Sequence, residues 1–525
     1  MTILRPITLI AILAVCHAAA ALRCQGREAV VENPAQLLAV LPRAGAGDTI
    51  TLKKGLWRDV RIVISRGGLD GRPLTIRAET PGETLLGGES SLQIDAPYVT
   101  VDGLAFYQGA IGKGAVIEFR SHHGIVQNTA ILDYNPASFE SECYWVLFNG
   151  NHNLLDRCYF KGKNNRGPLV GNAREGSRHN TVIRCYFKNV PYNIGNGREI
   201  IRIWGYGQND ELGSDGGFFT IENNLFDHAD GEGGEIISLK SNRNIVRRNT
   251  VIATRGCVNI RRGSFNTVAE NIILGQGAEG AHGLRMSGQS NVVARNFVSG
   301  CDYGIMITSG EYIDAFLTPE FRPHAAEDVS GKSAGRTATY PQVKNLTLAE
   351  NVLVGNSQSD LEVGSYYLDD WPRSQMVLLP EDSVITGNRF VRPEKGVSVV
   401  GALPKRDPLL DTFTFKPNRY SGNVVVGGKV KFDPAGRGFK VEPLPSGWRP
   451  EQEMMPGNPL TPSDVGPAWV IALRKAGKFP VEDSTDCNRP LNAITKKEAK
   501  EAKKQTEGKN SNPDKQGKKA RSKKA

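Results

Sequence analysis

A short pattern recurs along most of this chain: a polar or glycine turn, an aliphatic run, an Asn or Cys, and a second apolar run. The Asn or Cys markers are Asn128, Cys158, Cys185, Asn224, Asn249, Asn271, Asn296, Asn351, Asn388 and Asn423. Successive markers are separated by 30, 27, 39, 25, 22, 25, 55, 37 and 35 residues. A period of roughly 20 to 50 residues is typical of repeat architectures, in which each unit buries its apolar face against its neighbours.

The shorter intervals match one coil of a parallel β-helix, and the longer ones match coils that carry inserted loops. An Asn repeated at one bend can hydrogen-bond to the coils above and below it. We therefore predict an all-β chain, folded as a single-stranded right-handed parallel β-helix with long loop insertions. A leucine-rich repeat is excluded because regularly spaced Leu residues are missing. Cys158 and Cys185 are interpreted as small buried hydrophobic residues of the repeat.

The segments outside the repeat predict the boundaries. Arg5, an apolar run and small residues predict a signal peptide over residues 1–21, and hence a secreted or periplasmic protein. The β-helix is expected over residues 22–440, where Asn33 and Pro34 begin a short N-terminal helix that caps the stack. Residues 441–486 are rich in Pro and predict an irregular closing segment.

The net charge of +10 is concentrated at the C-terminus. Residues 496–525 contain 12 Lys or Arg and 4 Asp or Glu, a balance of +8, which leaves about +2 for the rest (10 − 8). We predict a disordered Lys-rich tail over residues 487–525. This charge does not indicate a nucleic-acid partner, and after the N-terminal segment no run is apolar enough to span a membrane. The eight Cys form no CxxC pair, which argues against a metal cluster on sulfur, and their spacing assigns no disulfide.

Three basic residues share a register with the markers. Lys240 lies 9 residues before its marker, Arg261 lies 10 before, and Arg285 lies 11 before. Their separations of 21 and 24 residues are close to one coil, so we expect the three side chains to stack on one face of neighbouring coils. Stacked cations repel one another. The row therefore indicates either an acidic ligand or a surface ladder relieved by acids such as Glu235.

The residues around this row resemble the central motif of polysaccharide lyase family six. The resemblance rests on the runs DGEGGEIISLKS (230–241) and NIRRG (259–263), and extends to NGREIIRI (196–203) and GLR (283–285). It covers residues 33–296 well and the remainder loosely. The family comprises alginate lyases and chondroitinase B, with a right-handed parallel β-helix fold. The resemblance therefore implies β-elimination on a polymer that contains uronate.

The chemistry requires a neutralised C6 carboxylate, a base that removes the C5 proton, and stabilisation of the departing 4-oxygen. The resemblance implies that Lys240 is the base and that Arg261 stabilises developing charge, because Arg does not readily release a proton. Arg285, Arg262 and His282 are the expected substrate-binding residues.

Family members often neutralise the carboxylate with Ca²⁺ held by an Asn and two Glu. The matching residues here are Asn196, Glu232 and Glu235, whose oxygens suit a hard cation. The family places one residue between the two Glu, whereas Gly233 and Gly234 separate them here. A glycine bulge would restore the geometry; otherwise the site is weakened, or cationic side chains replace the metal.

Two further departures concern the groove. Arg262 stands where the family commonly has His, and the stretch 204–217 is longer than in the family. The insert 312–342 is expected to be a loop beside the groove. Candidate sugar-stacking aromatic residues are Tyr206, Tyr303, Tyr312 and Trp371.

The predicted function is that of an exported lyase acting on an acidic polysaccharide, alginate, with dermatan sulfate as the other substrate in the family. A β-helix hydrolase of polygalacturonate would need clustered Asp carboxylates in the groove, and the basic row argues against it. A non-catalytic carbohydrate-binding solenoid stays open because of the altered spacing of the two Glu.

Overall fold

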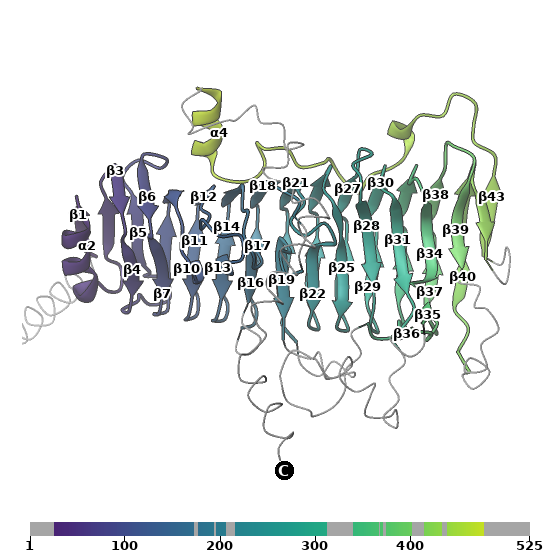
Figure 1. The fold of residues 1–525 in the computed structure, drawn as a ribbon, viewed down its shortest axis with the longest axis horizontal. Coiled ribbons are helices and arrows are strands. Elements are labelled where there is room, and N and C mark those ends of the chain that lie inside the picture. The colour runs from purple at the N-terminus through teal and green to yellow at the C-terminus, as the bar shows by residue number, and fades with distance from the viewer. Residues whose placement is uncertain are drawn as a thin grey trace, which may run out of the picture.

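The computed structural model describes residues 26–172, 177–193, 196–205, 216–311, 340–366, 368–370, 374–401, 414–432 and 438–476. The chain winds into three long parallel sheets, and successive coils add strands to each sheet in turn (Figure 1). The predicted parallel β-helix is therefore confirmed.

Sheet 1 begins at the capping helix. Its 14 strands, in order of pairing, are β1 (Glu28–Val31), β2 (Thr49–Leu52), β5 (Leu74–Ala78), β8 (Val99–Asp102), β11 (Ile125–Gln127), β14 (Leu154–Asp156), β17 (Thr181–Ile183), β20 (Thr220–Glu222), β23 (Ile245–Arg247), β26 (Thr267–Ala269), β29 (Val292–Ala294), β32 (Thr347–Ala349), β37 (Val384–Thr386) and β40 (Arg419–Ser421). Many of these strands have three residues, of which the central one is an aliphatic residue that points into the core.

Sheet 2 carries the basic residues singled out above. Its 13 strands are β4 (Arg61–Ile64), β7 (Ser91–Ile94), β10 (Gly114–Phe119), β13 (Cys143–Phe148), β16 (Val170–Asn172), β19 (Ile201–Trp204), β22 (Glu235–Lys240), β25 (Gly256–Arg262), β28 (Ala281–Met286), β31 (Tyr303–Thr308), β34 (Ser359–Ser365), β39 (Val397–Gly401) and β42 (Lys429–Lys431). A separate antiparallel pair joins β35 (Leu368–Asp370) to β36 (Ser374–Met376).

Sheet 3 completes each coil. Its 14 strands are β3 (Gly55–Arg58), β6 (Thr84–Gly88), β9 (Ala105–Gly109), β12 (Ala130–Leu132), β15 (Tyr159–Lys161), β18 (Tyr186–Val190), β21 (Leu225–Ala229), β24 (Thr250–Ile252), β27 (Ile272–Leu274), β30 (Phe297–Ser299), β33 (Val352–Val354), β38 (Arg389–Val391), β41 (Asn423–Val426) and β43 (Phe439–Glu442). Inside the helix, Phe160, Phe187 and Phe226 from successive strands of this sheet stack ring on ring, with centroids 5.2 and 4.8 Å apart.

The N-terminal cap forms as predicted. Helix α2 (Pro34–Val40) begins with Pro34, and the side chain of Asn33 accepts a hydrogen bond from the backbone N–H of Gln36 at 3.0 Å. A 3-10 turn, η1 (Leu41–Arg43), follows at once. The helix buries Leu37 against the core, so it closes the first coil (Figure 1).

The Asn markers form a continuous hydrogen-bonded ladder at the bend between sheets 1 and 3. In each step from Asn224 to Asn423, the side-chain oxygen of one Asn accepts from the backbone N–H and the amide of the Asn one coil earlier. The first marker was wrong by one residue. Asn128 adopts a positive φ of 49°, a conformation that Asn tolerates, and the fully buried inward position belongs to Thr129.

Replacing Asn249 by Ala tests this ladder. The side chain of Asn249 accepts from the Asn224 N–H at 3.0 Å and donates to Ile221 O at 2.9 Å, and all of these groups are buried. Leaving several buried polar groups without partners should lower the free energy of unfolding by about 3–5 kcal/mol, measured by urea denaturation. The control Arg247→Ala removes a neighbouring surface ion pair with Glu222 and should cost at most about 1 kcal/mol. Equal losses in both variants would contradict the ladder's role.

The segment after β43 is a strap that runs back along the outer face of sheet 3 (residues 443–476, Figure 1). It contains η4 (Pro450–Gln452) and α4 (Ala468–Lys475). Two apolar clusters lie under it: one packs Leu444, Trp448 and Met455 on the later coils, and the other packs Leu460, Val465, Trp469, Val470 and Leu473 on the earlier ones. The Trp469 indole donates to Asn128 O at 2.7 Å, which fixes α4 over β11 and β12.

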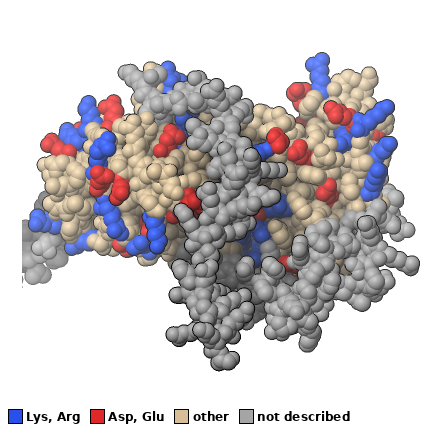
Figure 2. Space-filling model, viewed as in Figure 1, with Lys and Arg blue, Asp and Glu red and all other residues tan. Residues whose placement is uncertain are grey.

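Acidic and basic side chains are interspersed over the face shown in Figure 2. Among the residues with described coordinates, no helix is long and apolar enough to cross a membrane. The cysteines in the described ranges, Cys143, Cys158, Cys185, Cys257 and Cys301, are buried and free, and the predicted signal peptide and Lys-rich tail lie outside those ranges.

Candidate active site

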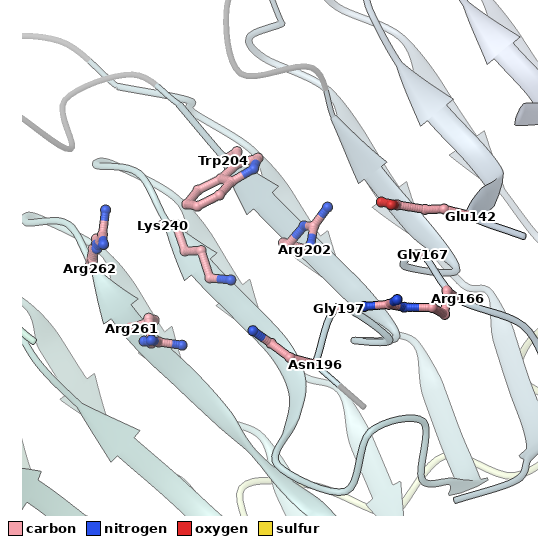
Figure 3. Close-up of a pocket in the computed structure, with 10 residues that line it drawn as sticks. All are labelled: Glu142, Arg166, Gly167, Asn196, Gly197, Arg202, Trp204, Lys240, Arg261 and Arg262. Atoms are coloured by element: carbon pink, nitrogen blue, oxygen red, sulfur yellow. The ribbon is translucent and has the colours of Figure 1, made fainter. Parts of the chain in front are cut away.

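A cavity of about 360 Å³ opens on the outer face of sheet 2 (Figure 3). Alternation along β19 explains why polar side chains face it: Ile201 and Ile203 point into the core, so Arg202 and Trp204 point outward. The residues that line it are Glu142, Arg166, Gly167, Asn196, Gly197, Arg202, Trp204, Lys240, Arg261 and Arg262. Four predicted site residues are among them.

The register of sheet 2 corrects the expected basic row. Lys240 pairs with Arg262 across β22 and β25, because Arg261 is an extra, bulged residue of β25 between the pairs Leu239–Ile260 and Lys240–Arg262. Arg285 is level with Asn259. The three cations are therefore not one straight ladder. The bulge places both Arg261 and Arg262 on the cavity wall.

Lys240 lies at the centre of the cavity and is nearly buried, with 7% of its surface exposed. Its Nζ atom donates to Glu199 Oε1 at 3.0 Å and lies 4.8 Å from the centre of the Trp204 ring. The Glu199 carboxylate and the indole fix the position of the amine, which points into the cavity (Figure 3).

Glu235 gathers the cations of the next two coils. Its Oε1 atom accepts from Asn259 Nδ2 at 2.6 Å and from Arg285 NH2 at 2.5 Å, and Arg261 NH1 lies 3.4 Å away. Burial acts to raise the pKa of Glu235, but the charges of Arg261, Arg285 and Lys240 outweigh it and hold the pKa below its usual value. Arg285 itself does not line the cavity; its ion pair with Glu235 holds that carboxylate in position.

Three carboxylates converge beside Lys240. Ligand atoms of Glu199, Glu232 and Glu235 all lie within 4.8 Å of one another. The two glycines make a turn that permits this: Gly233 has φ +73°, and a Cβ there would lie 2.6 Å from the Tyr192 ring. Burial, followed by the charge of Glu199, raises the pKa of Glu232 to about 7. Negatively charged carboxylates therefore lie close together in a buried place, and a bound cation would reduce the repulsion between them.

The donor set fits a hard divalent cation. Carboxylate oxygens are the ligands that Ca²⁺ prefers, and the buried Glu199 Oε2 atom makes no hydrogen bond. Three neighbouring buried atoms are also without hydrogen-bond partners: Asn259 Oδ1, Arg261 Nε and Arg285 Nε. Asn196 lies on the cavity wall and is exposed, so its amide oxygen can join the carboxylates. Unsatisfied polar atoms gathered at one point indicate a place built for a polar or charged ligand.

The far half of the cavity contains side chains that had no predicted role. Arg202 donates to the Tyr144 hydroxyl at 2.7 Å and lies 3.5 Å from Glu199 Oε2. Glu142 and Arg166 form the end wall (Figure 3). A guanidinium beside a tyrosine hydroxyl suits recognition of a sugar carboxylate.

The other predicted residues lie outside the cavity or outside the described ranges. His282 packs edge-on against Tyr303 with ring centroids 5.3 Å apart, and burial lowers its pKa. Neither residue lines the cavity. Tyr206, Tyr312 and Trp371, with most of the inserts 204–217 and 312–342, lie outside the described residues.

Glu199, which contacts Lys240, is another functional candidate that sequence reasoning missed. It belongs to the motif run 196–203, but its coil contains the insert 206–215, so its spacing to Lys240 is 41 residues instead of about one coil. Only the register β19–β22, in which Trp204 faces Lys240, brings the two together. A spacing search limited to single coils could not find it.

The chain is similar to a known protein family. The family model named Chondroitinase B matches residues 31–365. The solved PL6 family polysaccharide lyase Pedsa3628 from Pseudopedobacter saltans is 39% identical, with a TM-score of 0.74, over 84% of this chain and 99% of that one. No protein with a curated function matches.

Two further structures share the fold. The PL6 alginate lyase AlyGC is 23% identical, with a TM-score of 0.69, over 84% of this chain and 58% of AlyGC. A mannuronic acid specific family 6 lyase from human gut microbiota is 23% identical, with a TM-score of 0.68, over 86% of this chain and 98% of that one. The family match spans more than half of the chain, and the motifs that it contains surround the cavity. This chain belongs to polysaccharide lyase family six, and it is a polysaccharide lyase.

Proposed function

We propose that this lyase cleaves alginate by β-elimination, with Lys240 as the base. The observation that carries the proposal is the placement of a nearly buried lysine amine beside a cluster of three carboxylates, in a cavity that four arginines line. Alginate is chosen because AlyGC is an alginate lyase and the family six lyase from human gut microbiota is specific for mannuronic acid. Dermatan sulfate is the second candidate, because the matching family model is that of chondroitinase B.

In this mechanism, Lys240 Nζ takes the proton from C5 of a uronate bound in the cavity. The electrons of the C5–H bond form the C4–C5 double bond, and the C4–O4 bond breaks with its electron pair on O4, which takes up a proton from solvent. Arg261 and Arg262 stabilise the negative charge that develops on the carboxylate and the departing oxygen. Trp204 and Glu199 hold the amine in position.

A calcium ion fits beside Lys240. Glu199, Glu232 and Glu235 would hold it, with Asn196 next to them. When bound, calcium would neutralise the uronate carboxylate and so make the C5 proton more acidic.

An assay of the unsaturated uronate product tests the function. The purified protein is incubated separately with alginate, dermatan sulfate and pectate, and the product is followed by ultraviolet absorbance. Alginate should give the fastest rise. A faster rise on dermatan sulfate would mean that dermatan sulfate, not alginate, is the preferred substrate. If no polymer gives product, only the carbohydrate-binding alternative is left.

Calcium dependence is tested with Glu232→Gln. The variant keeps the shape of the side chain and loses its charge, so it should need at least tenfold more calcium for half-maximal activity. Calorimetric titration should show the same loss of affinity. Glu279→Gln is the control, because Glu279 is exposed and forms a surface ion pair with Arg255. Wild-type activity that is unchanged after chelation would remove calcium from the mechanism.

We also propose that the protein is exported, as the basic, apolar and small residues of segment 1–21 indicate. Sequencing of the mature N-terminus should find a chain that begins near residue 22. An uncut N-terminus would overturn the proposal.

A further inference from the structure

Lys163 is a buried cation behind the wall of the cavity. It lies in the turn between β15 and β16, and only 2% of its surface is exposed. Four oxygens surround its Nζ atom: Gly167 O at 2.8 Å, Asn165 O at 2.9 Å, Asn165 Oδ1 at 3.1 Å and Arg166 O at 3.3 Å. All four belong to the turn that follows the lysine.

This arrangement resembles the oxygen cage of a bound cation. Three successive carbonyls converge on one point, and their dipoles repel one another unless a positive charge lies between them. Burial lowers the pKa of Lys163 to about 7, while the four oxygens favour the protonated amine, which has three hydrogens to donate. A buried ammonium is tolerated when it is hydrogen-bonded in this way.

The other side of the same turn faces the cavity. Arg166 and Gly167, whose carbonyls bind Lys163, are two of the residues that line the cavity. The backbone of Arg166 is held in place by Cys143 N and Phe139 O, at 3.2 and 2.9 Å. The ammonium therefore fixes the inner side of a turn whose outer side is part of the cavity wall.

A second buried cation joins this turn to the carboxylates. The guanidinium of Arg198 donates to Lys163 O at 3.3 Å and Asn165 O at 3.2 Å on one side, and to Gly231 O at 2.7 Å on the other. The backbone N–H of Arg198 donates to Glu232 Oε2 at 3.1 Å. A shift of the turn 163–167 would therefore be passed through Arg198 to Gly231 and Glu232, beside the carboxylate cluster.

We propose that Lys163 is a positioning residue for substrate binding: its ammonium acts as an internal cation that gathers the carbonyls of residues 165–167 and so sets the position of Arg166 and Gly167 on the cavity wall. It does not touch the reacting atoms. The effect on catalysis rests on the proposed lyase function, whereas the cation cage does not.

The test replaces Lys163 by Ala, which leaves a space the size of a propylammonium ion. The Lys163→Ala variant should have a KM for alginate at least tenfold higher than the wild type, with kcat changed less than threefold. Propylammonium should raise its melting temperature and restore its KM. Tetramethylammonium, which has the same charge and no hydrogen to donate, should do neither. Lys163→Met fills the space without charge and should show the high KM with no rescue.

Two controls separate positioning from general damage. Lys344→Ala removes an exposed lysine that pairs with Glu381, and should change neither KM nor melting temperature. Arg166→Ala should raise KM, and adding Lys163→Ala to it should raise KM little further, because both changes act on the same wall.

The outcomes are distinct. If propylammonium raises the melting temperature without restoring KM, the positioning role is overturned, while the binding of a cation by the four oxygens is supported. Absence of thermal rescue by propylammonium would overturn the cage itself. If the wild type cleaves no polymer, the proposed function fails; thermal rescue still tests the cage, and retardation of the variants in alginate-containing gels still tests the wall.

Discussion

Lys240→Ala should lower kcat on alginate by roughly a thousandfold, the usual contribution of a positioned general base. The reason is geometric: in the part of the chain that the structure describes, Lys240 is the one lysine that lines the cavity. The product assay described above measures the loss, and single-turnover kinetics show that it lies in the chemical step.

The fold of this variant should persist. Lys240 is at the outer end of β22, and its neighbours Leu239 and Ile237 remain in the core. Thermal unfolding should therefore shift by only a few degrees, because Glu199 loses one cationic partner, Lys240, and keeps the other, Arg202. Lys188→Ala on sheet 3 is a matched control and should keep full activity. If Lys240→Ala retains a tenth of the wild-type rate, another group is the base.

Truncation after Glu442 should have the largest effect on stability. It removes the strap and uncovers the apolar side chains of sheet 3 beneath it, including Tyr159, Tyr186 and Leu225. Val465 and Val470 of the strap are buried, and its other apolar side chains in the two clusters are partly buried. Because a fully buried apolar side chain contributes about 1.5–3 kcal/mol, the net loss should be about 5 kcal/mol after the entropy of the freed chain is included. The melting temperature should fall by roughly 10 °C.

The matched control is truncation after Ala476, which keeps the strap and removes only the residues beyond it. This variant should have the same melting temperature as the full-length protein. Light scattering should reveal self-association of the shorter chain, because exposed apolar stripes of this size pair with one another. Equal melting temperatures for the two truncations would show that the strap contributes nothing to stability.

The core of the fold could be predicted because its signal is periodic. Residues such as Asn249 and Asn271 repeat once per coil and make the same hydrogen bonds in each coil. The error at Asn128 has a local cause: Asn favours both the inward ladder position and the positive φ of the preceding residue, and pattern alone cannot separate the two.

The site was harder to predict because it depends on departures from periodicity. The bulge at Arg261 in β25 shifts the register, so that Arg262 rather than Arg261 faces Lys240. The inserted loop in the coil of Glu199 conceals its distance from Lys240 in space. The buried cation Lys163 has no counterpart in the repeat, and only the path of the backbone shows that four oxygens surround it.

The strap also alters how this solenoid can come apart. In a simple stack each coil contacts only its neighbours, so opening spreads from an end one coil at a time. Here Trp448 packs on the coils near the C-terminal end and Trp469 on those near β12, with a single continuous segment between them. Fraying of the last coils must therefore loosen a segment that also covers the middle of the molecule. Amide hydrogen exchange should show the strap and the coils beneath it opening as one cooperative unit.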